Sequence, residues 1–199
     1  MIPRGFWRHF LSCRKGGPLI EFGFIAPTVL LAISGVIDLM LVMFVTSLME
    51  GGLQDASRLG RTGFQPANMS RQDAIAQKIA DATIGLVDMN NVQIATTVYP
   101  SFDSVGQPEP FQDASPFNGV YDAGEQYNDV NGNGQWDPDM GLAGLGGPGD
   151  VVLYQVTYDW SLLTPLVGEL LGQGGKIPLS VSVAVRNEPW GTPPPPLGP

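Results

Sequence analysis

One short segment carries oxygen-bearing side chains at alternate positions, namely Asp129, Asn131, Asn133, Gln135 and Asp137. Alternate side chains of a tight loop can gather their oxygens around one point, and Gly134 permits the sharp turn that such a loop needs. Hard oxygen ligands with no histidine or cysteine nearby favour Ca²⁺ over transition metals. The segment therefore predicts a calcium site. We expect a structural role for the metal, because the surrounding residues have little apolar content.

The spacing matches the start of an EF-hand loop, with oxygens at positions 1, 3, 5 and 9, glycine at position 6 and a backbone carbonyl at position 7. Position 12 is Met140, where an EF-hand has a bidentate glutamate. Three carboxylates are candidates for the missing ligand: Asp122, Glu125 and Asp139. Segment 121–125 also resembles the acidic stretch that accompanies extracellular bacterial calcium loops. The competing interpretation is a series of Asn-Gly and Asp turns with solvated side chains.

The composition offers few residues for catalysis, zinc binding or nucleic-acid binding. The single histidine is His9, so no histidine-based catalytic triad or zinc site can form in the rest of the chain. No Lys or Arg lies between Lys78 and Lys176, which excludes nucleic acid as a partner of this region. We expect the protein not to be an enzyme.

The predicted calcium loop belongs to an insertion over residues 101–150 that is rich in Gly, Pro, Asn and Asp. Alternating apolar residues predict strands on both sides of it, at 92–98 and 152–160, and a third strand at 177–185. Ser70 opens a predicted helix whose apolar stripe would pack as core or bind a partner, and it comprises Ile75, Ile79, Ala82 and Leu86.

These elements predict an α+β fold for residues 64–190, in which a small antiparallel sheet is covered by a helix. Residues 191–199 form a Pro-rich tail. This extracytoplasmic domain would follow a membrane anchor, for which the preceding residues give the evidence.

From Phe22 to Met49 the chain is apolar, with Asp38 as its only charged residue. As a helix this run would be about 42 Å long, more than the roughly 30 Å hydrocarbon core of a bilayer. A cleaved secretory signal has a shorter apolar region and a small-residue cleavage site, which residues 48–51 lack. We therefore expect a retained transmembrane and stalk helix over residues 17–63.

The first twenty residues contain four basic residues and no acidic one, although the whole chain has a net charge of −9. By the positive-inside rule the basic leader 1–16 stays in the cytoplasm and the C-terminal domain lies outside. The one cysteine, Cys13, lies in this leader and cannot form an internal disulfide.

Two carboxylates interrupt the anchor, because Glu21 stands at its start and Asp38 near its middle. A carboxylate inside a membrane is costly and usually faces protein or water, so it implies a partner. The alternative is that Glu21 lies among the headgroups and Asp38 is tolerated in its protonated form.

The basic leader ends at Gly16, and Glu21 follows five residues later. This pattern resembles a type IV prepilin processing site with cleavage after Gly16, although Gly17 and Pro18 replace the usual phenylalanine start. The resemblance implies that Glu21 pairs with the new N-terminal amine of a neighbouring subunit. Such a pair would neutralise a cation at membrane depth.

Segment 20–27 and the apolar run after it, together with segments 158–166 and 179–186, resemble the TadE/TadG-like family of pilin-like proteins. The resemblance covers the anchor and the final third of the chain. It implies a minor pilin or pseudopilin of a Tad-type pilus or secretion system, cleaved by a prepilin peptidase and assembling with other pilin-like subunits. It also implies a bacterial inner-membrane protein with a periplasmic domain, or a subunit of a cell-surface pilus.

Two further functions without catalysis remain open. One is a membrane-anchored, calcium-stabilised adhesion or binding domain that does not polymerise. The other is an anchored periplasmic scaffold for secretion machinery that needs no cleavage. Gly16 and Glu21 distinguish these functions from a pilin, because both residues matter only for processing and assembly.

Overall fold

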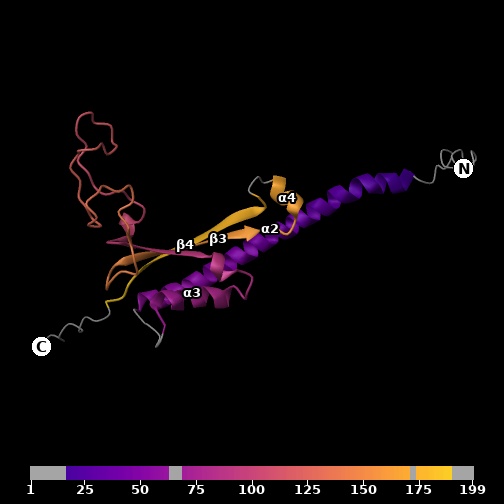
Figure 1. The fold of residues 1–199 in the computed structure, drawn as a ribbon, viewed down its shortest axis with the longest axis horizontal. Helices are drawn as coiled ribbons and strands as arrows, with labels where there is room; N and C mark the ends of the chain where they lie inside the picture. Colours follow the sequence, from indigo (N-terminus) through magenta and orange to yellow (C-terminus); the bar gives the residue numbers. More distant parts are fainter. Residues whose placement is uncertain (1–16, 63–68, 171–173, 190–199) are drawn as a thin grey trace, which may run out of the picture. The chain divides into compact units, whose positions relative to one another are not determined.

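The computed structural model describes residues 17–62, 69–170 and 174–189. The predicted leader with Gly16 and the predicted tail lie outside the described residues. Figure 1 shows the elements along the chain. In chain order they are α2 (Gly17–Arg61), α3 (Arg71–Ala82), η2 (Met89–Asn91), β1 (Gln93–Tyr99), η3 (Phe102–Ser104), β2 (Leu142–Ala143), β3 (Val151–Ser161), α4 (Pro165–Leu170) and β4 (Lys176–Arg186).

Helix α2 is continuous over 45 residues and contains Pro27. Among the described residues it is the helix whose length and apolar composition would allow it to cross a membrane. Its last turn carries Arg58 and Arg61, which interact favourably with the negative end of the helix dipole. The prediction of one long apolar N-terminal helix is therefore confirmed.

The contacts divide the chain into two compact units. One unit comprises α2 up to Met43 together with Trp160–Ile177, and the other comprises Phe44–Asp159 and the chain from Pro178 onward. Helix α2 and strands β3 and β4 contribute residues to both units.

Strand order in the sheet is β2-β1-β3-β4, and β1 pairs antiparallel with both of its neighbours. Ile94 lies opposite Val156 and Val98 lies opposite Val152. The three predicted strands are thus present and the α+β fold class is confirmed. Strand β2 was not predicted, because it has only two residues and both are exposed.

The larger unit has a core formed by one stripe of α2 and one face of the sheet. Val45, Met49 and Leu53 recur at a helical spacing and are almost completely buried. Tyr154 on β3 is also buried, and it contacts Gly60 so closely that a Cβ there would overlap its hydroxyl group. The end of α2 therefore packs directly on the sheet.

Helix α3 begins at Ser70, whose side chain accepts the N–H of Asp73 at 3.0 Å, as the capping pattern predicts. It contacts α2 at Gly52, where an added Cβ would lie 2.8 Å from the Ala82 Cβ. The predicted stripe up to Leu86 was wrong at its end. The helix stops at Ala82 because Ile84 has a positive φ of 47°, which an α-helix cannot accommodate.

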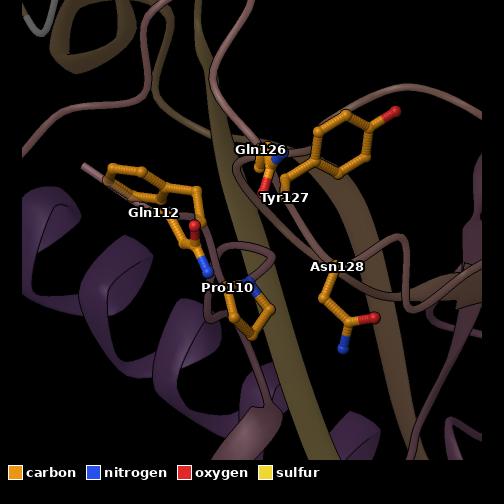
Figure 2. A pocket seen from close by; sticks show the side chains of 6 residues that line it. Pro110, Gln112, Gln126, Tyr127 and Asn128 are labelled. Atoms are coloured by element: carbon orange, nitrogen blue, oxygen red, sulfur yellow. The ribbon is translucent and has the colours of Figure 1, made fainter. Parts of the chain in front are cut away.

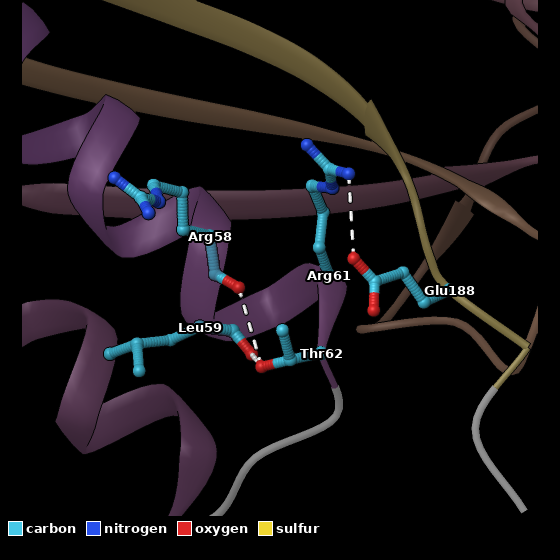
Figure 3. Close-up of polar contacts among 5 residues, drawn as sticks. All are labelled: Arg58, Leu59, Arg61, Thr62 and Glu188. Atoms are coloured by element: carbon cyan, nitrogen blue, oxygen red, sulfur yellow. Dashed lines mark hydrogen bonds and ion pairs between the residues drawn. The ribbon is translucent and has the colours of Figure 1, made fainter.

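The C-terminal end of α2 is tied to the residues that follow β4 (Figure 3). The Glu188 N–H donates to the Arg61 carbonyl at 2.9 Å, and the two side chains form an ion pair of 3.4 Å. Both side chains are about half exposed, so the ion pair itself stabilises the fold only weakly. The backbone hydrogen bond satisfies a helix-end carbonyl that has no partner within the helix.

Candidate functional site

The insertion between β1 and β3 belongs to the larger unit, and its C-terminal end packs against β1 and β3. Met140 is buried with Tyr99 and Val151 in a small apolar cluster. Asp139 accepts a hydrogen bond of 3.0 Å from the Tyr99 hydroxyl. Position 12 of the predicted calcium loop is thus a core residue, and Asp139 is engaged with β1.

Loop 129–137 wraps around the carboxylate of Asp129. Its Oδ1 accepts the N–H of Gly132 at 2.6 Å, and its Oδ2 accepts the N–H of Gly134 at 2.8 Å. The φ of Gly134 is 80°, in the left-handed region that glycine adopts most easily. Gln135 follows, and its N–H donates to the Asn133 side-chain oxygen at 2.7 Å.

The side chains of this loop converge on Asp137. The amides of Asn131 and Asn133 both donate to Asp137 Oδ2, at 2.7 Å and 2.5 Å. The side-chain oxygens of the two amides accept backbone N–H groups, Asn131 Oδ1 from Asn133 at 3.1 Å and Asn133 Oδ1 from Gln135 at 2.7 Å. The side chains of Asn131, Asn133 and Asp137 therefore lie together, joined by hydrogen bonds within the loop.

Glu109, which the sequence patterns did not indicate, accepts hydrogen bonds from both ends of this loop. Its side chain is fully buried, and Oε1 accepts the N–H of Val130 at 2.7 Å. Its Oε2 accepts the N–H of Asp137 at 3.2 Å. The indole N–H of Trp136 donates to the Glu109 carbonyl at 2.9 Å. Glu109 therefore joins both ends of loop 129–137.

The other two candidate ligands, Glu125 and Asp122, belong to a different loop. Glu125 accepts the N–H of Ala114 at 2.7 Å and the N–H of Asp122 at 3.0 Å. Within this loop Asp113 Oδ2 accepts the N–H of Gly119 at 2.8 Å. Segment 113–122 is thus a second acidic loop, closed by Glu125 as Glu109 closes the first.

The two loops are related by an approximate two-fold arrangement. Phe111 and Tyr127 form an antiparallel bridge, flanked by hydrogen bonds of 2.8 Å from Gln112 N to Gln126 O and from Asn128 N to Pro110 O. Figure 2 shows this junction, where the same residues line a shallow pocket. Corresponding residues make corresponding bonds, and the pairs are Glu109 with Glu125, Asp113 with Asp129, Asn118 with Asn133, Gly119 with Gly134, and Asp122 with Asp137.

Aromatic rings follow the same two-fold arrangement. Tyr121 and Trp136 stack with centroids 4.5 Å apart and an interplanar angle of 12°. Phe111 meets Trp136 edge-on at 6.0 Å, and Tyr127 meets Tyr121 edge-on at 5.8 Å. Such ring pairs contribute about 0.5–1.5 kcal/mol each beyond their buried area. They give the insertion an apolar centre of its own.

A repeat in the sequence gives the signal for this arrangement. The pattern Glu-x-aromatic-x-Asp occurs at 109–113 and again at 125–129, and Asn-Gly-x-aromatic-Asp occurs at 118–122 and again at 133–137. Only the second copy has the alternating oxygens of an EF-hand loop. The first copy has one residue more between its Asp and its Asn-Gly. Because of this extra residue, it does not match the ligand spacing of an EF-hand loop.

Each loop contains only a few acidic side chains, together with side-chain amides. Among the described residues no three His, Cys, Asp or Glu side chains gather tightly enough to form a metal-holding cluster by themselves. The carboxylates do create a negative environment. Burial raises the pKa of Tyr127 above its ordinary value of 10.0, and the charge of nearby Asp129 raises it further.

The predicted assembly residues lie at the start of α2. Gly17 is the first residue of the helix, and Glu21 is exposed one turn later. Asp38 is different, because it is 2% exposed and accepts two backbone N–H groups, from Leu163 at 2.8 Å and from Thr164 at 3.2 Å. Asp38 therefore has hydrogen-bond partners within this chain.

Comparisons with protein-family models, with curated proteins and with solved structures find no match to this chain.

Proposed function

We propose that this chain is a membrane-anchored, pilin-like subunit of a Tad-type pilus or secretion system. The observation that carries the proposal is the difference in side-chain exposure between the two halves of α2. Its first half exposes large apolar side chains, whereas Val45, Met49 and Leu53 in its second half are buried in an α+β unit. A pilin-like subunit needs such a helix, because the exposed half lies first in lipid and later against the helices of other subunits.

The exposed half of the helix has a length that fits a bilayer. Residues 17–37 would be about 31 Å long, close to the roughly 30 Å hydrocarbon core. Large apolar side chains at least 48% exposed in this stretch are Leu19, Ile20, Phe22, Phe24, Ile25, Val29, Leu30, Ile33, Val36 and Ile37. Exposed large apolar side chains continue beyond Asp38 at Leu39, Met40, Met43 and Phe44, so the apolar surface of the helix extends past this carboxylate. The C-terminal domain would then lie in the periplasm.

Calcium is part of this proposal. Loop 129–137 would bind it through the side chains of Asp129, Asn131, Asn133 and Asp137 and the carbonyl of Gln135, while Glu109 holds the two ends of the loop. The observation that supports this fit is that loop 129–137 wraps around the Asp129 carboxylate, with Gly134 in the left-handed region as in a tight calcium loop. Bound calcium would stabilise a cysteine-free insertion in an extracytoplasmic compartment.

The test is the N-terminal sequence and mass of the mature protein from membranes that contain an active prepilin peptidase. We expect the mature chain to begin at Gly17, and Gly16→Val to abolish cleavage. The matched control is Gly5→Val, which changes a leader glycine away from the predicted bond and should leave processing intact. A wild-type chain that still begins at Met1 would overturn the pilin proposal.

Assembly is tested separately with Glu21→Ala. In a pilin-like subunit this variant is cleaved and anchored normally but fails to co-purify with the other pilin-like subunits, because the new N-terminal amine loses its carboxylate partner. Normal co-purification of Glu21→Ala would contradict the proposed assembly contact.

An anchored adhesion domain that does not polymerise is the second candidate. The observation in its favour is the exposure of apolar side chains on loop 113–122, since Phe117 is 81% exposed and Val120 is 61% exposed. Cleavage at Gly16 separates the two candidates, because an adhesion domain does not need it.

A further inference from the structure

The geometry points to a second divalent-cation site in the insertion, formed by loop 113–122 with Asp113, Asn118 and Asp122 as ligands and Glu125 as the closing carboxylate. The insertion would thus hold a pair of Ca²⁺ ions in two loops related by the two-fold arrangement. This inference rests on the calcium part of the proposed function and is independent of the membrane and pilin parts.

One oxygen of the Asp113 carboxylate is buried and has no hydrogen-bond partner. Asp113 Oδ1 is shielded from solvent and makes no hydrogen bond, whereas Oδ2 of the same carboxylate accepts the N–H of Gly119. In the other loop both oxygens of Asp129 accept backbone N–H groups. A buried carboxylate oxygen without a donor is unfavourable, and coordination of a cation removes that cost.

Within the insertion itself there is no basic side chain that could pair with these carboxylates. The sequence contains no Lys or Arg from position 79 to position 175, which includes both loops and their surroundings. Asp113, Asp122 and Glu125 therefore cannot be neutralised by a basic side chain of the insertion. A cation from solution is the available counter-charge, and the oxygen donors favour Ca²⁺ or a similar hard ion.

The two loops match in the positions of these residues and in their hydrogen bonds. Asn118 donates to Asp122 Oδ2 at 3.0 Å, as Asn133 donates to Asp137 Oδ2. Gly119 and Gly134 have φ values of 73° and 80° at corresponding positions. Loop 113–122 thus repeats the Asn–Asp hydrogen bond and the glycine turn of loop 129–137.

The two sites would also be coupled. Glu125 closes loop 113–122 but lies just before loop 129–137 in the chain, and the intervening bridge joins Phe111 to Tyr127. A cation that orders one loop would therefore position the strand segment leading into the other. We expect loss of one site to weaken the remaining site by about tenfold or more, as for changes beyond the direct ligands of a metal.

The experiment is isothermal titration of the full chain in detergent micelles with Ca²⁺ alone, after removal of divalent ions. We expect a stoichiometry of two for the wild type and one for Asp113→Asn and for Asp129→Asn. Asp103→Asn is the matched control, because Asp103 is an exposed carboxylate of the same insertion outside both loops, and it should retain two. Far-ultraviolet circular dichroism verifies that each variant is folded.

A wild-type stoichiometry of one, lost in Asp129→Asn but retained in Asp113→Asn, would overturn the second site and leave the calcium loop at 129–137 intact. No binding at all would overturn both cation sites, whereas prepilin processing would be unaffected. If Asp113→Asn does not fold, the milder Glu125→Gln replaces it. This variant should weaken one of two binding events by at least about tenfold, and two unchanged events would contradict the inference.

Discussion

The carboxylate of Asp38, in the apolar helix α2, accepts a hydrogen bond of 2.8 Å from the backbone N–H of Leu163, more than one hundred residues later in the chain. The adjacent N–H of Thr164 donates to the other carboxylate oxygen at 3.2 Å. The segment Thr164–Leu170 includes the short helix α4, so Asp38 accepts donors at the point where this helix begins. A charged acceptor is well suited to the N–H groups exposed there.

Replacement of Asp38 should loosen the segment around α4. Asp38→Ala removes both acceptors, and each hydrogen bond to a charged group contributes about 1.5–3 kcal/mol. We therefore expect amide hydrogen exchange at Leu163 and Thr164 to accelerate by about tenfold to a hundredfold. Hydrogen-exchange mass spectrometry or NMR of the micelle-bound protein measures this change.

Asp38→Asn should accelerate exchange less than Asp38→Ala, because the amide keeps one acceptor oxygen. Asp55→Asn is the matched control, since Asp55 is an exposed carboxylate further along the same helix. Equal exchange rates at Leu163 in the wild type and Asp38→Ala would show that the hydrogen bond does not hold this segment.

The contact between α2 and the sheet predicts opposite effects for two glycines of the same helix. Gly60→Ala places a Cβ against the Tyr154 hydroxyl and should destabilise the protein by about 1–3 kcal/mol. Gly51→Ala meets no neighbouring atom within 4 Å and should stabilise it by up to about 1 kcal/mol through helix propensity. Urea unfolding followed by tryptophan fluorescence measures both, and a neutral Gly60→Ala would contradict the close packing.

The pairing of Tyr99 with Asp139 predicts a loss of stability in alkaline solution. Burial raises the pKa of Tyr99 above its ordinary value of 10.0, and the hydrogen bond to Asp139 raises it further. Neutral Tyr99 therefore stabilises the fold fully below pH 10, and this contribution is lost as the pH rises from about 10 through the higher folded-state pKa.

Urea unfolding at about pH 9 and about pH 11 tests this pH dependence. The free energy of unfolding should fall less between the two pH values in Tyr99→Phe than in the wild type, because phenylalanine cannot ionise. An equal fall in both proteins would assign the alkaline loss to other groups.

Removal of divalent ions should destabilise the insertion. A ligand present at about one hundred times its dissociation constant stabilises the native state by about 2.7 kcal/mol. We expect EDTA to increase proteolysis within residues 101–150, and added Ca²⁺ to restore protection. Asp129→Asn should be cleaved rapidly with or without Ca²⁺. Identical digestion of the wild type under both conditions would argue against a structural metal.

Local patterns were sufficient for most of the fold. The apolar run predicts α2, the alternation of apolar residues predicts β1, β3 and β4, and Ser70 predicts the start of α3. Each of these signals depends on periodicity or on a cap formed by neighbouring residues, so no knowledge of distant contacts is needed. The short strand β2 and helix α4 carry no such signal.

Contacts between distant segments determine the partners of loop 129–137 and of Asp38, which local sequence patterns do not predict. The sequence predicts the oxygens of loop 129–137, but Glu109 comes from a segment twenty residues upstream. Its place depends on tertiary contacts, which are the bridge between Phe111 and Tyr127 and the backbone hydrogen bonds of Glu109 with Trp136 and Asp137. Likewise the sequence indicates that Asp38 needs a partner, and the tertiary structure supplies the N–H groups of Leu163 and Thr164. A buried carboxylate must be satisfied, but which part of the chain satisfies it depends on how the whole chain folds.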